Sequence, residues 1–209
     1  MNAPVDLSRL SPGFPNAALD SQTVFRACLG AMSEPGRVTS LDSALLESTP
    51  AGLSGAAVAI LLALLDQDTT LWLGEGLREG DAGAYFRFHT GCAIAPSLAQ
   101  AGFALLSGRD ESAALSDFMQ GSEAFPDRSA TLVVQCCGLA NVGDAGEGNC
   151  WRLTGPGIRD YRLLKASGVR GDFPQQWSDN RKGFPCGVDV FFASGLSLAG
   201  LPRTTRLEG

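Results

Sequence analysis

The chain is poor in the side chains that most enzymes use for acid–base or covalent chemistry. It has a single histidine, His89, and only two lysines, Lys165 and Lys182. No carboxylate pair, phosphate-binding glycine loop or metal-ligand spacing stands out along the sequence. The six cysteines include no C-x-x-C pair, which argues against the common zinc and dithiol motifs. We therefore expect reduced, buried thiols, no resident cofactor and no metal site.

Excess positive charge and long apolar segments are also missing. With 16 basic and 22 acidic residues the net charge is −6, which argues against a duplex nucleic-acid binder because such proteins usually carry a basic face. The longest apolar run, residues 53–65, is shorter than the roughly 18 residues that a membrane helix requires. Residues 1–13 lack the basic-then-apolar pattern of a signal peptide. The sequence predicts a soluble, cytoplasmic protein that partners neither nucleic acid nor membrane.

The chain does have enough apolar sequence for a sizeable core. Hydrophobic residues make up 44% of its 209 residues and charged residues 18%, a balance typical of a folded domain. Residues 1–18, rich in Pro, Asn and Ala, predict a tail that packs loosely or docks on a neighbour. No repeat or long linker divides the remainder, so residues 19–209 are expected to form one domain.

Helical and alternating apolar patterns succeed one another along the chain. Asp20 or Ser21 is the expected N-cap of a first helix that runs through Ala31. Further helices are predicted at residues 52–65, 96–101, 111–120 and 171–179. Strands are predicted at residues 69–73, 84–89, 103–106, 131–137, 150–153, 158–164 and 188–193, with one more before the C-terminus. This alternation indicates an α/β fold, a layered mixed β-sheet flanked by helices.

His89 and Cys92 are a candidate nucleophilic pair. Such a pair needs the thiol within hydrogen-bond reach of the imidazole, and surroundings that favour the thiolate. A spacing of three positions around a Thr-Gly turn could meet that geometry, although no orienting acid is visible. The structural alternative is a histidine whose ring hydrogen-bonds a loop carbonyl and holds the turn.

Lys182 raises the alternative of a pyridoxal phosphate enzyme. That chemistry needs a Schiff-base lysine, an acid for the pyridine nitrogen and an anion cup. Lys182, between Arg181 and Gly183, could be the lysine and Asp189 the acid. No Ser/Gly-rich phosphate cup stands out, so a solvated turn lysine is the competing interpretation.

The glycine-rich segment at residues 138–149 invites a nucleotide-binding interpretation. A glycine loop binds phosphate when it opens a helix, because the first N–H groups of that helix face the ligand. Here Asp144 and Glu147 would repel phosphate, and a strand follows. We predict a hairpin loop instead.

The strand near the C-terminus carries the most specific signal. Its alternate residues place Phe192 on one face and Asp189 with Phe191 on the other, and both faces are otherwise apolar. The strand is therefore central in a sheet or covered by a partner, which makes Phe191 and Phe192 candidate interface residues. A buried Asp189 needs a cation, and Arg203 and Arg206 are available. Alternatively, Arg203 and Arg206 recognise an anion such as ATP or a phosphonate.

Several segments together resemble one protein family. They are residues 21–27 (S-Q-T-V-F-R-A), 31–36 (A-M-S-E-P-G), 88–92 (F-H-T-G-C), 131–135 (T-L-V-V-Q), 153–158 (L-T-G-P-G-I), Asn180 with Phe184-Pro185, 187–189 (G-V-D) and 201–205 (L-P-R-T-T). Each segment alone is weak, but their order and spacing are specific. Over about residues 14–206 the chain is similar to the H-subunit family of the bacterial carbon–phosphorus lyase system.

The resemblance implies a cytoplasmic protein whose fold is like a reduced pyridoxal-phosphate transferase without the cofactor. It implies a homodimer in isolation, and assembly with the G, I and J subunits into a core complex. That machinery breaks down alkylphosphonates. Its first step replaces the adenine of ATP with a phosphonate such as methylphosphonate, giving ribose 1-methylphosphonate 5-triphosphate.

The same resemblance places the catalyst of that step in the I subunit and supplies no catalytic residue for this chain. We therefore expect a non-catalytic subunit that offers its sheet edges and C-terminal strands for docking. Two features depart from the family pattern. Cys186 stands where a larger side chain is expected, and the segment at residues 138–148 is longer than the family hairpin needs.

Overall fold

The computed structural model describes residues 10–141 and 149–208. Its α-helices are α1 (Ala17–Ser33), α2 (Gly55–Leu64), α3 (Ala82–Thr90) and α4 (Phe173–Lys182). Its strands are β1 (Thr39–Ser40), β2 (Thr70–Leu73), β3 (Ala93–Ile94), β4 (Phe103–Ser107), β5 (Thr131–Gln135), β6 (Gly138–Asn141), β7 (Asn149–Thr154), β8 (Arg162–Ser167), β9 (Asp189–Ser194), β10 (Ser197–Leu201) and β11 (Arg206–Glu208). Short 3₁₀ turns occupy Ser43–Leu45, Leu98–Gln100, Leu115–Asp117 and Pro126–Arg128.

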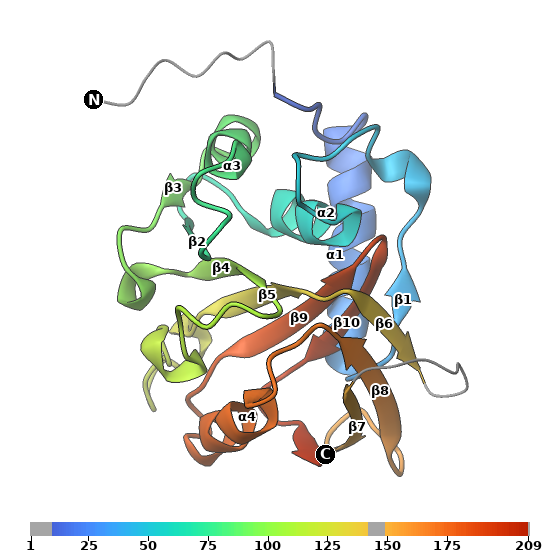
Figure 1. Cartoon of the computed structure of the whole chain (residues 1–209), viewed down its shortest axis with the longest axis vertical. Coiled ribbons are helices and arrows are strands. Elements are labelled where there is room, and N and C mark those ends of the chain that lie inside the picture. Colours follow the sequence, from blue (N-terminus) through green and yellow to red (C-terminus); the bar gives the residue numbers. More distant parts are fainter. Residues whose placement is uncertain (1–9, 142–148, 209) are drawn as a thin grey trace.

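The strands form two sheets. The larger has seven strands in the order β1-β10-β9-β5-β4-β2-β3. Its run from β3 to β9 is parallel, whereas β10 and β1 continue it antiparallel. The smaller sheet is antiparallel, in the order β11-β7-β8-β6. The predicted mixed sheet with flanking helices is therefore confirmed (Figure 1).

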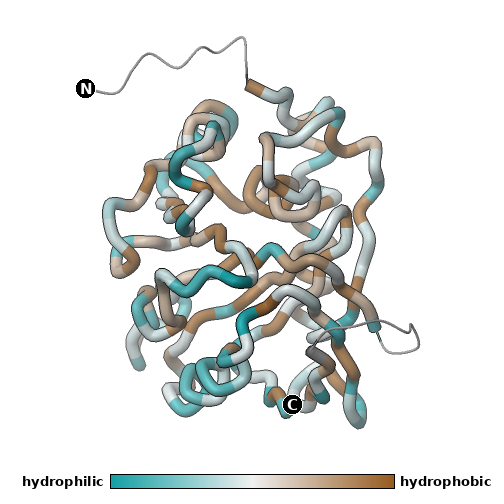
Figure 2. Tube along the Cα trace, viewed as in Figure 1, coloured by the Kyte–Doolittle hydropathy of each residue, from teal (hydrophilic) through white to brown (hydrophobic). Residues whose placement is uncertain are grey.

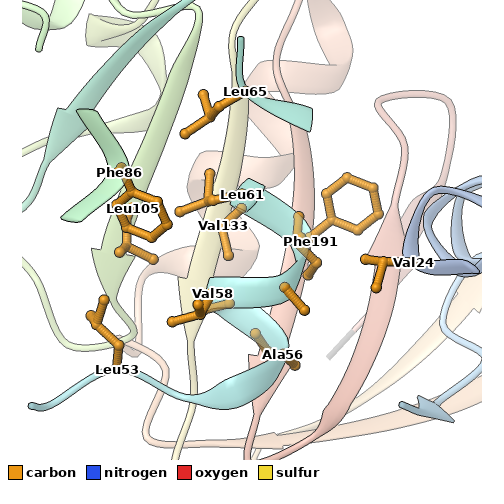
Figure 3. Close-up of a cluster of buried hydrophobic side chains, with 14 of the residues drawn as sticks. Val24, Leu53, Ala56, Val58, Leu61, Leu65, Phe86, Leu105, Val133 and Phe191 are labelled. Atoms are coloured by element: carbon orange, nitrogen blue, oxygen red, sulfur yellow. The ribbon is translucent and has the colours of Figure 1, made fainter. Parts of the chain in front are cut away.

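Helices α1, α2 and α3 cover one face of the large sheet. Their buried side chains, among them Val24, Leu61 and Phe86, pack on Val133 and Phe191 of the central strands (Figure 3). Helix α2 is buried almost all round, which confirms the prediction made from its unbroken apolar run. Among the described helices, none combines the length and hydrophobicity needed to cross a membrane.

Helix α4 and the small sheet cover the opposite face. Aromatic rings fill this layer: Phe173 lies 5.3 Å from Trp151 and 5.3 Å from Phe192, measured between ring centroids. Trp177 stacks on Phe173 at 6.0 Å and donates its indole N–H to the carbonyl of Thr205. Most residues of α4 are hydrophilic, whereas the central strands are mostly hydrophobic (Figure 2). The large sheet is thus the middle of three layers.

One predicted strand is wrong. Residues 84–89 belong to α3, whose buried residues Ala82, Tyr85 and Phe86 follow helical spacing. Aromatic residues at consecutive positions fit both the two-residue and the helical period, so alternation alone misleads here. The usable signal is Gly91, which takes φ +77° and donates its N–H to the carbonyl of Arg87 as a left-handed helix cap.

The helix predicted at residues 111–120 is also wrong, since only Leu115–Asp117 forms a 3₁₀ turn there. Its carboxylates bond local backbone instead of leaving it free for a helical ladder. Asp110 accepts from the N–H of Ser112 at 2.9 Å, and Asp117 accepts from the N–H of Ala114 at 2.8 Å.

The hairpin predicted at residues 138–149 is wrong as well. Strands β6 and β7 do not pair with each other, because β8 lies between them in the small sheet. Residues 142–148, which include the two acidic residues of that segment, lie outside the described residues.

The first helix begins earlier than predicted. Its N-cap is Asn16, whose side chain accepts the N–H of Leu19, while the carboxylate of Asp20 accepts the N–H of Asn16. The residues before it do not form a loose tail from residue 10 onward, because Leu10 and Phe14 pack against the helical core. Residues 1–9 of the predicted tail lie outside the described residues.

Candidate functional site

Strand β9 is central, between β5 and β10, and its two faces enter different cores. Phe191 packs with the α1–α3 layer and Phe192 with the α4 layer. Both rings are buried within the chain itself, at 3% and 0% exposure. The two apolar faces predicted from sequence are confirmed, and they are covered by this chain and not by a partner. Neither phenylalanine reaches a surface where it could form an interface.

Asp189 begins β9 and forms the predicted ion pair with Arg203. One carboxylate oxygen accepts the backbone N–H of Arg203 at 2.7 Å and its Nε at 3.1 Å, and the other lies 2.5 Å from Nη2. The two side chains keep 24% and 13% of their surface exposed. Arg203 also donates to the carbonyls of Pro126 and Pro185 and to the hydroxyl of Ser129. Its guanidinium therefore links three loops through these hydrogen bonds.

A cavity of about 420 Å³ lies beside this ion pair. Separate segments supply its walls: Arg181 in the last turn of α4, Phe184 in the loop that follows, Arg203 in the turn before β11, and Arg206 in β11. These elements are neighbours in the fold, since β11 contacts both β7 and α4. Arg206, the second predicted cation, lies at this cavity and is exposed, not paired with Asp189.

The turn after β7 closes the cavity with Gly155. This residue takes φ +136°, and a Cβ there would lie 3.2 Å from the carbonyl oxygen of Thr204. Glycine is therefore required for the two turns to approach so closely. Residues 153–158 and 201–205 are two of the segments that resemble the family. They are far apart in sequence but lie together at this cavity.

His89 and Cys92 do not form a nucleophilic pair. The Nε2 of His89 lies 3.0 Å from the carbonyl of Ser11, to which it donates, and the ring rests against Tyr85. Burial raises the pKa of the Cys92 thiol, while its hydrogen bond to Thr90 and the charge of Arg87 lower it by less. A raised pKa is the opposite of what a cysteine nucleophile needs. His89 bonds a backbone carbonyl, as the structural alternative predicted, but that carbonyl belongs to the segment that precedes α1 and not to the Thr-Gly turn.

Lys182 lies on the surface at the end of α4. Its ammonium group is 2.7 Å from Asp179, and 71% of its side chain is exposed. Asp189 is engaged with Arg203, so the structure does not bring Lys182 and Asp189 together as an aldimine lysine and its acid. Within residues 10–141 and 149–208, no group of three His, Cys, Asp or Glu side chains has a metal-binding arrangement.

The cysteines are free thiols, as predicted, but not all are buried. Cys28 and Cys92 are buried, Cys136 and Cys186 are half-buried, and Cys137 and Cys150 are exposed. Cys186 follows the cis Phe184-Pro185 bond, where the family pattern suggests a larger residue. Its side chain is half-buried and lines a cavity of about 240 Å³.

Comparison with known sequences identifies the protein family of this chain. Residues 12–208 match the PhnH family, described as a bacterial phosphonate metabolism protein. The chain belongs to the PhnH family. It is 32% identical over 198 residues to the alpha-D-ribose 1-methylphosphonate 5-triphosphate synthase subunit PhnH of Rhizobium meliloti (strain 1021), with 95% of each chain covered. It is 34% identical over 187 residues to HtxG of Stutzerimonas stutzeri, named as a C-P lyase subunit protein, covering 90% of this chain and 85% of HtxG.

Proposed function

We propose that this chain is the PhnH-type subunit of a cytoplasmic complex that makes ribose 1-methylphosphonate 5-triphosphate from ATP and methylphosphonate. The observation that carries the proposal is end-to-end similarity to the PhnH subunit of Rhizobium meliloti, with 95% of both chains covered. Because the match leaves no large part of either chain unaccounted for, it supports a role for the whole chain in phosphonate breakdown.

The role within that complex is assembly and not bond-making. Each candidate catalytic group in the described residues is engaged elsewhere: His89 with Ser11, Lys182 with Asp179, and Asp189 with Arg203. The G, I and J subunits are the proposed partners, with the I subunit supplying the catalyst.

Helix α1 is the surface best suited to a protein partner. Leu19, Phe25 and Leu29 expose 61%, 45% and 55% of their surface along its 17 residues. Phe25 and Leu29 lie one turn apart on the same side of the helix, whereas the spacing of Leu19 places it on an adjacent side. Exposed apolar residues that share a helix side commonly mark contact sites. The edges of the large sheet are less suitable than expected, because β1 and β3, which end it, are only two residues long. We propose that the α1 face contacts a second copy in the isolated protein.

Reconstitution tests the proposed function. The purified chain is mixed with the G, I and J subunits, and co-elution is followed by size-exclusion chromatography. Adenine release from ATP and methylphosphonate is then measured with and without the chain. We expect co-elution, and adenine release that depends on the chain. A chain that elutes alone, and whose omission leaves adenine release unchanged, contradicts the proposal.

A further inference from the structure

We propose that the cavity beside the Asp189–Arg203 ion pair binds a phosphate or phosphonate group, with Arg181 and Arg206 as its donors. The choice of phosphorus oxyanions over other anions rests on the proposed function. The presence of an anion site rests on the geometry alone.

The first argument is charge. In a chain with net charge −6, three arginines line this one cavity: Arg181, Arg203 and Arg206. No aspartate or glutamate is among the described residues that line it. Arg203 is neutralised by Asp189, which lies outside the lining, so Arg181 and Arg206 supply uncompensated positive charge. A positive cavity in an acidic protein attracts anions from solution.

The second argument is that these two guanidinium groups have no described partner. Within residues 10–141 and 149–208, neither Arg181 nor Arg206 forms a salt bridge, whereas Arg203 uses all three of its nitrogens. Arginine presents a planar fork of N–H groups that matches two oxygens of a phosphate or phosphonate. Arg203 is therefore a fixed part of the cavity lining, whereas the guanidinium groups of Arg181 and Arg206 are available to bind an anion.

The third argument is unsatisfied polar atoms. In the described part of the chain, the buried side-chain nitrogens and oxygens that lack a hydrogen-bond partner are the Nε of Arg181 and the Oγ1 of Thr205. Arg181 lines the cavity, so its unpaired Nε is at the proposed site; Thr205 is fully buried next to the lining residues and does not itself line the cavity. Native proteins satisfy nearly all such atoms, and exceptions are concentrated where a ligand or a function accounts for them.

The larger cavity of about 700 Å³ at the start of α3 suits an anion less well. Arg78 and Arg87 line it together with Glu79 and Asp81, so its charges are mixed. The guanidinium of Arg78 is also occupied, because it lies 4.4 Å from the centre of the Trp72 ring and donates to the carbonyl of Leu73. The cavity lined by Arg181, Arg203 and Arg206 (the arginine cavity), in contrast, has charged side chains of one sign and the volume of a small-molecule site.

Isothermal titration calorimetry on the isolated full chain tests the site. The probes are inorganic phosphate, methylphosphonate and ATP, with acetate as a planar anion for comparison. We expect the phosphorus oxyanions to bind more tightly than acetate, with affinity that falls as salt is raised. A preference for ATP identifies a phosphate chain as the ligand, and a preference for methylphosphonate identifies the free phosphonate. Flat titrations with all three phosphorus probes overturn the proposal.

Matched variants locate the site. Arg206→Gln is expected to weaken binding about tenfold, and Arg181→Gln with Arg206→Gln to abolish it, since each removes a charge-assisted donor. Arg109→Gln, which removes another exposed charge, in the loop after β4, should leave affinity unchanged. Unchanged affinity in the Arg206→Gln variant, which is exposed and should fold, overturns the proposed site even if Arg181→Gln is unstable.

The two proposals can fail separately. Co-elution of the doubly substituted chain with the other subunits, together with lost anion binding, supports both. A chain that binds phosphate through Arg206 but never joins the subunits overturns the proposed function and leaves the anion site standing.

Discussion

The side chain of Asn180 holds the backbone of Val188 through two hydrogen bonds. Its Oδ1 accepts the N–H of Val188 at 2.8 Å, and its Nδ2 donates to the carbonyl of Val188 at 3.0 Å. Asn180 is 7% exposed, and it joins the last turn of α4 to the residue just before β9. This clamp fixes both ends of the loop that carries Phe184, and with it one wall of the arginine cavity.

Replacing Asn180 with alanine should destabilise the fold by about 2–4 kcal/mol. The change leaves the N–H and the carbonyl of Val188 buried without partners, and each such group costs about 1–3 kcal/mol. Urea unfolding at neutral pH measures the difference. Gln175→Ala on the exposed side of the same helix is the control, with an expected change below about 0.5 kcal/mol. Equal loss in both variants would show that the clamp contributes nothing specific.

Arg203→Met should destabilise the chain by about 2–3 kcal/mol. It leaves the carboxylate of Asp189 half-buried without a cation, and breaking a fully buried pair costs about 3–5 kcal/mol. The control is Arg37→Met, because Arg37 pairs with Glu34 on the surface with 58% and 45% of the side chains exposed. Such pairs contribute about 0–1 kcal/mol. Similar unfolding midpoints for the two variants would contradict a structural role for Arg203.

The Arg170–Asp172 pair predicts a pH-dependent contribution to stability. Hydrogen bonds from Arg170, chiefly, lower the pKa of Asp172 from 3.8 to about 2. A lowered pKa stabilises the fold above the unfolded value, and this stabilisation disappears as pH falls from about 4 to about 2. Since 53% of the Asp172 side chain is exposed, solvent screening reduces its contribution to about 1 kcal/mol.

Urea unfolding of wild type and Asp172→Asn at several pH values tests this contribution. We expect the difference in the free energy of unfolding between the two proteins to be constant above about pH 5 and to narrow toward pH 3. Glu123→Gln, which removes an exposed carboxylate outside this pair, should run parallel to wild type across the range. A difference that widens on acidification would reverse the sign and contradict the assignment.

The exposed cysteines should react with a thiol reagent faster than the cysteines whose thiol pKa is raised by burial. Burial raises the pKa of Cys28 and of Cys136 to about 12, so little thiolate is present at pH 8. Cys137 and Cys150 are exposed and should be labelled first by Ellman's reagent in the native protein. Cys137→Ser with Cys150→Ser should remove the fast phase, and denaturant should expose the remaining thiols. Rapid labelling of Cys28 in the folded chain would contradict its burial.

Sequence patterns predicted the elements whose environment is uniform. Helix α2 and strand β9 are buried on all sides, so their apolar runs leave one interpretation at each place. Helix α3 is different. Its nine residues, which include Tyr85, Phe86 and Phe88, are too few to distinguish the helical period from the two-residue period of a strand. Only its tertiary contacts decide, and Phe88 remains 56% exposed as the helical period requires.

At the candidate site, sequence reasoning identified Asp189 and offered Arg203 or Arg206 as its cation, but it did not identify Arg181. A carboxylate inside an apolar strand needs a cation, so a local pattern is enough to predict an ion pair at Asp189, and the structure selects Arg203 over Arg206. Arg181 has no such signal, because an arginine near a helix C-terminus usually faces solvent and favours the helix dipole. Its position at the cavity depends on how α4, β7 and β11 meet, which no local pattern records.

The face of α1 gives the last prediction, which concerns self-association. Phe25 and Leu29 lie one turn apart, exposed by 45% and 55%, and Arg26 is the charged residue between them. An exposed apolar pair on a helix can pack on its own copy about a twofold axis, and two opposed negative charges would prevent that. Phe25→Glu with Leu29→Glu should therefore convert a dimer into a monomer, as measured by light scattering after size exclusion. Phe125→Glu, at 50% exposure on another surface, should leave the mass unchanged. Because all three positions are exposed, each variant should keep the unfolding midpoint of wild type, so that a change in mass reports on the contact itself. A doubly substituted chain that remains dimeric would place the self-contact on another surface.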